Sequence, residues 1–112
     1  MLSKKNRIGN RVVIAKLFAK GKLHKDRFLV FKYEPSPEDT SRFAVVVGKK
    51  IYKKAVKRNR LRRQIFEALR LHMNLLENNF NIIVVARPSI SDSRINFQDI
   101  NKSINTFINT IN

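Results

Sequence analysis

The side chains best suited to chemistry in this sequence are the cations of residues 49–63. Nine of these fifteen residues are lysine or arginine, and none is acidic. Lysine binds phosphate as a point charge, and arginine meets two phosphate oxygens at once through its planar fork. At the start of a helix, such a run opposes the helix dipole unless an anion binds there. We therefore expect a nucleic acid as the partner of this segment.

A solvated helix face is the other interpretation of a charged run, and the pattern of signs argues against it. Solvated faces pair glutamate with lysine four residues apart, whereas this segment has no acid until Glu67. Asn59 adds a donor and an acceptor that can touch a base edge. The predicted nucleic-acid contacts are Lys53, Lys54, Lys57, Arg58, Asn59, Arg60, Arg62 and Arg63, and Lys49 and Lys50 lie just before them.

Catalytic and metal-binding patterns are missing from the sequence. His24 and His72 have no neighbouring partner that suggests a catalytic pair, and three glycines do not form a phosphate-binding loop. The chain has no cysteine, which excludes disulfides and thiolate metal sites. We expect no catalytic residue and no metal site on the polypeptide.

Aromatic side chains offer a second possible contact with nucleic acid. Phe18 falls in a predicted first helix, and Phe31 and Tyr33 fall in a predicted first strand. Together they could line a groove in which unpaired bases stack. Each ring also fits a hydrophobic stripe, so a core position stays open as the alternative.

The charge is uneven along the chain, which carries a formal net charge of +16 and has a pI near 11.1. Residues 1–32 contribute +9 and residues 49–63 another +9, whereas residues 33–48 are net −2 and residues 64–112 are neutral. Such a concentration of positive charge favours the binding of polyanions. No segment approaches the roughly 20 apolar residues of a membrane span, so we expect a soluble cytoplasmic protein. The length fits one RNA-binding domain over residues 1–112, with residues 1–9 as a flexible basic segment.

The first half of the chain contains signals for a helix and two strands. Asn10 is suited to cap a first helix, and Gly21 to end it. Residues 28–33 are rich in aromatic and β-branched types, as in strands. A polar loop with prolines leads to a second strand over residues 42–48.

The second half predicts a long helix, a strand and a last helix. The long helix begins near residues 54–56 and continues to about residue 76. Its apolar face would hold Leu61, Ile65, Ala68, Leu69, His72 and Leu76. Residues 82–86 form an apolar strand, and Asn96 with Asp99 has the spacing of a capping box. The buried stripe of the last helix would hold Phe97, Ile100, Ile104, Phe107, Ile108 and Ile111. The result is a two-layer α/β (α+β) sandwich of order α-β-β-(β)-α-β-α, with the strands flanking the long helix parallel.

The basic segment, with its flanks, reads VVVGKKIYKKAVKRNRLRRQI and resembles the protein component of bacterial ribonuclease P. The motif is a strand that ends in lysines, then Ala-Val, then Arg-Asn-Arg and two further cations. Its positions here are Lys49, Lys50, Ala55, Val56, Arg58, Asn59, Arg60, Arg62 and Arg63. The FLVF run from residue 28 and the IIVVAR run from residue 82 agree with the same family.

The resemblance implies a fold with an unusual left-handed βαβ crossover, and a specific function. A large RNA, ribonuclease P RNA, would bind Mg²⁺ and cleave precursor tRNA to give the mature 5′ end, and the Arg-Asn-Arg helix would contact that RNA. A cleft between the first helix and the sheet would hold the single-stranded 5′ leader, lined by Phe18, Phe31, Lys49 and Lys50. Ile14 stands where the family often has an aromatic residue, so we expect a different leader preference. No membrane and no obligate protein partner is implied.

Two other classes remain open on the sequence alone. A ribosomal or RNA-chaperone protein would share the charge and the fold but would have no processing role. A sequence-specific DNA regulator fits less well, because the sequence has no recognisable helix-turn-helix motif and no dimerisation element. Only the extended motif and the aromatic residues separate the first class from the ribonuclease P interpretation.

Overall fold

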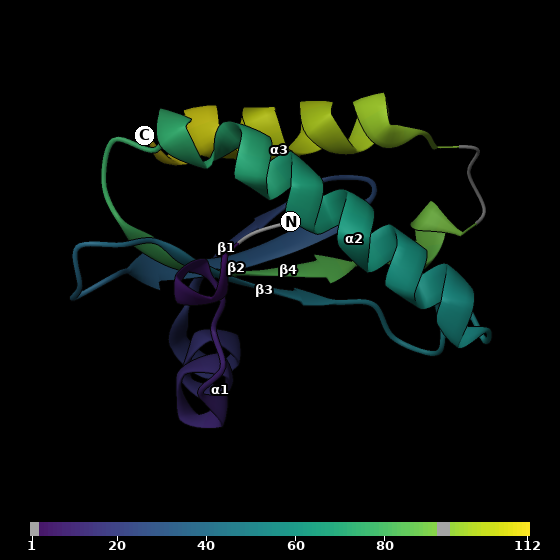
Figure 1. Ribbon diagram of the computed structural model, residues 1–112, viewed down its shortest axis with the longest axis horizontal. Helices are drawn as coiled ribbons and strands as arrows, with labels where there is room; N and C mark the ends of the chain where they lie inside the picture. Colours follow the sequence, from purple (N-terminus) through teal and green to yellow (C-terminus); the bar gives the residue numbers. More distant parts are fainter. Residues whose placement is uncertain (1–2, 92–94) are drawn as a thin grey trace.

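The structure is a computed structural model that describes residues 3–91 and 95–112 (Figure 1). The described residues form a four-stranded sheet, three α-helices and three short 3-10 helices. The α-helices are α1 (Arg11–Lys20), α2 (Ala55–His72) and α3 (Phe97–Ile111). The strands are β1 (Lys22–Lys25), β2 (Leu29–Pro35), β3 (Arg42–Val46) and β4 (Phe80–Ala86), and the 3-10 helices are η1 (Lys4–Asn6), η2 (Met73–Leu75) and η3 (Pro88–Ile90).

The sheet has the strand order β1-β2-β4-β3, so β1 and β3 are its edges. β1 pairs with β2 and β2 with β4 in antiparallel fashion, whereas β3 and β4 are parallel, as the sequence predicted. α2 connects these two parallel strands. With β3 on the near side of β4 and α2 above the sheet in Figure 1, the connection is left-handed, against the usual hand. The family resemblance implied this crossover.

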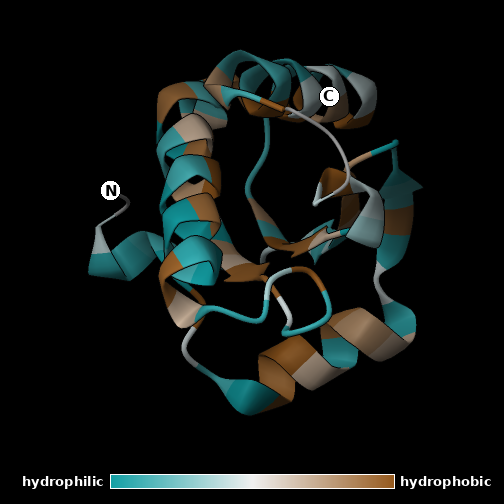
Figure 2. Cartoon of the chain, turned by 90° about the vertical axis from the view of Figure 1, so that its right-hand side faces the viewer, coloured by the Kyte–Doolittle hydropathy of each residue, from teal (hydrophilic) through white to brown (hydrophobic). Residues whose placement is uncertain are grey.

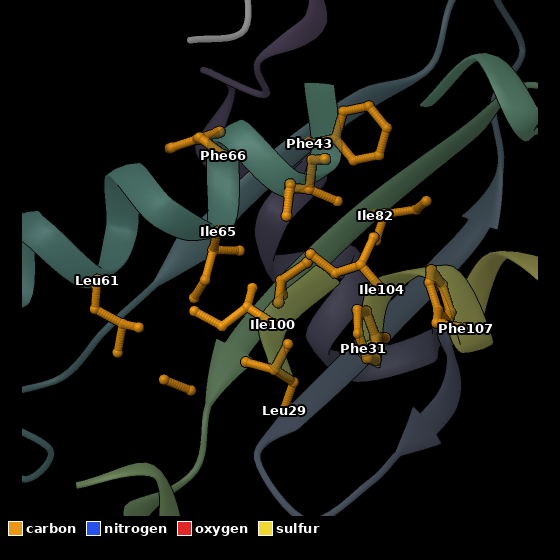
Figure 3. Close-up of a cluster of buried hydrophobic side chains, with 14 of the residues drawn as sticks. Leu29, Phe31, Phe43, Leu61, Ile65, Phe66, Ile82, Ile100, Ile104 and Phe107 are labelled. Carbon is orange, nitrogen blue, oxygen red and sulfur yellow. The ribbon is translucent and has the colours of Figure 1, made fainter. Parts of the chain in front are cut away.

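The main core lies between the sheet and the layer formed by α2 and α3 (Figure 3). Alternation along each strand sends every second side chain to this face. Fully buried residues there include Leu29, Phe31, Phe43, Ile65, Leu69, Ile82, Val84, Ile104 and Phe107. The predicted stripe of α3 is the one that is buried, and the Asn96–Asp99 capping box is present.

α1 packs on the opposite face of the sheet from α2 and α3 (Figures 1 and 2). The Asn10 side chain accepts a hydrogen bond from the backbone N–H of Val12, so the predicted cap is confirmed. Leu17 of α1 and Ile83 of β4 are both fully buried. Val46 on this face of the sheet is 37% exposed, so α1 covers only part of the face.

One strand and the end of the long helix differ from the sequence prediction. β1 has the pattern Lys-Leu-His-Lys, which is short and mostly polar and gave no strand signal. Such composition is typical of an edge strand protected against pairing with other chains. α2 ends at His72, and a 3-10 turn replaces the predicted last turn. The predicted order had an optional third strand just before the long helix, whereas the additional strand, β1, precedes the two predicted strands.

The N-terminal segment contacts β3. Asn6 is buried, and its side-chain amide donates hydrogen bonds to the hydroxyl of Thr40 and to the carbonyl of Ser41. The backbone N–H of Ile8 donates to the carbonyl of Phe43 at 2.9 Å. Flexibility of residues 1–9 stays a prediction, and residues 1 and 2 lie outside the described residues.

Gly21 is predicted to be essential for seating α1 on the sheet. A Cβ at this position would lie 2.6 Å from the carbonyl oxygen of Leu17 and 3.3 Å from the backbone nitrogen of Tyr33. Gly21→Ala should therefore lower the free energy of unfolding by about 1–3 kcal/mol, as overpacking does. Gly9→Ala is the matched control, because a Cβ there meets nothing within 4 Å. Chemical denaturation measures both, and equal stability of the two variants would contradict this packing.

Candidate nucleic-acid interface

The lysines before α2 lie on a turn that is held by buried residues on either side of it. Val47 and Ile51 are buried in the main core, and the backbone N–H of Ile51 donates to the carbonyl of Gly48 at 3.0 Å. Lys49 and Lys50 lie between these anchors and are exposed. The apolar anchors thus hold the backbone while both ammonium groups extend into solvent.

The start of α2 has none of the usual features that compensate a helix dipole. Its N-cap residue, Lys54, makes no side-chain capping hydrogen bond, and its first turn contains no acid. The first backbone N–H groups of a helix have no partner within the helix. Lys53, Lys54, Lys57 and Arg60 are exposed around this end. The combination of free N–H groups, dipole and cations is suited to phosphate.

Arg58 differs from the other cations of this surface. Like Arg62 it is half-buried, and its Nη1 donates to the backbone carbonyl oxygens of Tyr52 at 2.9 Å and Lys53 at 2.7 Å. The guanidinium thus turns back onto the chain that leads into the helix. The sequence motif did not reveal these bonds, because they depend on the path of the backbone before α2.

Shallow grooves run along the two flanks of α2. One, of about 400 Å³, is lined by Val56, Asn59, Arg62, Arg63 and Phe66. The other, of about 310 Å³, is lined by Tyr52, Lys57, Arg60, Leu61, Gln64 and Ile95. Each groove combines an apolar wall with cationic side chains, an arrangement that can accept both a base and a phosphate.

Asn59 is held by its neighbour in the first of these grooves. Its Oδ1 accepts a hydrogen bond from Nη1 of Arg62 at 3.0 Å. The Asn59 side chain is exposed, and the bond from Arg62 orients its amide group. The structure therefore brings Asn59 and Arg62 together as a preset polar pair.

An ion pair marks the end of the cationic surface along α2. Arg70 contacts Glu67 through Nη2 and Oε1 at 2.5 Å, and its Nε also donates to that carboxylate. The hydrogen bond from Arg70 is the largest cause that lowers the pKa of Glu67 to about 2. Glu67 is therefore charged throughout the neutral pH range and offsets the charge of Arg70. Glu67 is the only acid of α2, and among the cations before it only Arg63 lies one helical turn away.

The aromatic residues predicted to line a second site are separated by the sheet. Phe18 is 44% exposed on α1. Phe31 is fully buried on the opposite face, where its ring stacks on Phe107 with centroids 4.0 Å apart (Figure 3). The prediction that Phe31 lines the leader cleft is therefore wrong, because both ring faces are unavailable to a base. Tyr33 lies on the same side as Phe31, against Phe80 and Phe107.

A row of valines occupies the sheet face that α1 leaves partly open. Register places Val30, Val85 and Val46 side by side on β2, β4 and β3. Val46 is 37% exposed, and the other two are half-buried. Lys49 and Lys50 follow Val46 closely in sequence. Strand alternation alone puts Val30 and Phe31 on opposite faces of β2, but only the position of α1 shows which face is open.

Two side chains limit this open face. Ile14 of α1 is half-buried, at the position where the resemblance led us to expect an aromatic ring. Lys16 reaches Glu34 of β2 across the gap between α1 and the sheet, with Nζ 3.9 Å from Oε2. Glu34 places one negative charge on this otherwise basic side of the molecule.

The described residues contain neither a metal-site cluster nor a membrane-spanning helix. Within residues 3–91 and 95–112, no three histidine, cysteine, aspartate or glutamate side chains gather as a metal site would require. Over the same ranges, no helix combines the length and the apolar character needed to cross a membrane.

Comparison with known proteins gives one consistent answer. The family model described as Ribonuclease P matches residues 2–112. The ribonuclease P protein component of Syntrophomonas wolfei is 38% identical over 93 residues, which cover 83% of this chain and 77% of that protein. The solved RNase P protein of Thermotoga maritima has a TM-score of 0.86 at 26% identity, covering 95% of this chain and 97% of that one. That of Staphylococcus aureus has a TM-score of 0.80 at 26% identity, covering 95% and 94%. With its basic surface at the start of α2, the chain belongs to the ribonuclease P protein family.

Proposed function

We propose that this chain is the protein subunit of a bacterial ribonuclease P and that it contacts two RNAs through two surfaces. The α2 surface, defined as residues 49–63, docks on the ribonuclease P RNA. The α1 face, defined as Phe18 with the valine row of the sheet, receives the 5′ leader of precursor tRNA. The observation that carries the proposal is the exposed, acid-free start of α2 in a chain that the family model matches over residues 2–112.

The α2 surface suits a folded RNA because its charges are fixed rather than spread over mobile tails. The anchored turn presents Lys49 and Lys50, and the helix presents Arg60 and Arg63. Binding would release counterions from the phosphates, so the logarithm of affinity should fall with the logarithm of salt concentration by about 0.7–0.9 per contact. The apolar walls of the two grooves can receive bases that leave the RNA helix.

The α1 face suits unpaired nucleotides for a different reason. An exposed ring and a row of half-buried valines offer apolar area to base faces, which duplex RNA keeps stacked inside its helix. Lys32 lies on the same face of β2 and is half-buried, and can pair with a backbone phosphate. A single-stranded leader presents both unstacked base faces and backbone phosphates.

The chemistry is assigned to the RNA. Mg²⁺ bound mainly by the RNA would activate water for hydrolysis of the precursor tRNA backbone, in the cytoplasm. The protein would raise affinity for the substrate and reduce the Mg²⁺ concentration that the RNA requires, because its cations offset the repulsion between RNA phosphates. No protein side chain is assigned a catalytic role.

Reconstitution separates this function from that of a ribosomal or RNA-chaperone protein. We expect the full chain to restore 5′ cleavage of precursor tRNA by a bacterial ribonuclease P RNA at a Mg²⁺ concentration too low for the RNA alone. The measurement is the rate of single-turnover cleavage, followed by gel electrophoresis. RNA binding without any change in cleavage would favour the chaperone alternative and contradict the proposal.

Phe18→Ala tests the α1 face. Loss of one base-stacking ring costs about 1–3 kcal/mol, or roughly 5- to 150-fold in affinity. We expect this loss for precursor tRNA with a leader and little change for mature tRNA, both bound to the reconstituted holoenzyme. Val12→Ala is the control, since Val12 is a 75% exposed apolar residue of the same helix. Equal losses with both substrates would place Phe18 outside the leader site.

A further inference from the structure

Arg58 lies on the inward stripe of α2, and Arg62, four residues later, is half-buried on the same flank. Residues three and seven positions further along a helix share a face, and here these are Leu61 and Ile65, both buried in the core. Arg60 and Arg63 lie off this stripe and are exposed. The helix therefore points Arg58 toward the body of the protein. At this end of α2 it meets the backbone of residues 52 and 53, which lead into the helix.

The hydrogen bonds of Arg58 fix the backbone at the start of α2, where no side chain caps the helix. Nη1 has two protons, and they match the two acceptors, the carbonyls of Tyr52 and Lys53. Hydrogen bonds from a charged donor are stronger than neutral ones. They fix the segment that carries Lys53 and Lys54, in a helix start with no side-chain cap. Tyr52 in turn contacts Lys57, whose Nζ lies 5.9 Å from the ring centroid.

We infer that Arg58 is a positioning residue of the RNA-docking surface and not one of its phosphate contacts. It holds the neighbouring lysines close together against their mutual repulsion, so that the RNA meets them already in place. The inference rests on the proposed function, because it concerns how the same surface binds. It also corrects the expectation from the motif, which placed Arg58 among the direct contacts with RNA.

The salt dependence of RNA affinity distinguishes positioning from contact. A residue that neutralises a phosphate contributes to the slope of log affinity against log salt, whereas a residue that orders its neighbours changes affinity at constant slope. We propose to measure this slope for the full chain and three variants, Arg58→Ala, Arg60→Ala and Arg70→Ala, with a ribonuclease P RNA transcript as the probe. Arg70 is the matched control because Glu67 already offsets its charge.

The expected pattern differs for each variant. Arg60→Ala should reduce the slope by about 0.7–0.9. Arg58→Ala should leave the slope unchanged and weaken binding about tenfold, the cost of ordering two or three long side chains on binding. Arg70→Ala should change neither. Hydrogen exchange of the free protein should become faster at the amides of residues 52–55 in Arg58→Ala and stay unchanged in Arg60→Ala.

Failure of the positioning role and failure of the proposed function would give different results. A slope reduced by Arg58→Ala as much as by Arg60→Ala would overturn the positioning role and leave the proposed function intact. If Arg60→Ala left the slope of log affinity against log salt unchanged, the α2 surface would not be the RNA-binding surface, and the proposed function itself would be contradicted. Should Arg58→Ala not fold, Arg58→Gln gives the same comparison, because its neutral amide can donate to one carbonyl. A positioning role predicts partial rescue of affinity by that amide at full slope.

Discussion

Repulsion between cations at the start of α2 is the constraint on which the rest of the structure depends. The helix begins without a capping side chain and without an acid, beside lysines on both sides. Such a helix start is unfavourable in isolation, and burial of Val47, Ile51 and Leu61 holds it in place. The free energy stored in this arrangement is released when phosphates replace water around the cations. A surface that is costly in the free protein is therefore prepared for an anionic partner.

The sheet determines where the α2 surface and the α1 face lie relative to each other. α2 and α3 cover one face and α1 covers part of the other, so the two proposed RNA-binding surfaces lie on different sides of the same four strands (Figure 1). β3 connects them, because Val46 faces the α1 side and the lysine turn follows directly. A substrate on the α1 face and an RNA on α2 could then share one rigid support. β3 is an edge strand, and its carboxyl end leads into that turn.

Much of this arrangement was readable from the sequence, and the failures have physical causes. Periodicity located α3 and its buried stripe, and the apolar runs located the parallel pair β3 and β4. β1 was not located because an edge strand of Lys-Leu-His-Lys carries no apolar pattern. Phe31 was misplaced because alternation defines two faces of a strand but not which helix covers each. The role of Arg58 depends on carbonyl positions in a turn, which the residue types along α2 do not encode.

The most direct measurement uses the absence of cysteine from the chain. A cysteine introduced by Val56→Cys on α2 or by Ala19→Cys on α1 can each carry an iron chelate that generates hydroxyl radicals. In the reconstituted complex with precursor tRNA, the account predicts discrete cleavage of the ribonuclease P RNA from position 56 and cleavage of the 5′ leader from position 19. Leader cleavage from position 56, or no cleavage of the ribonuclease P RNA from that position, would contradict the assignment of α2 as the docking surface.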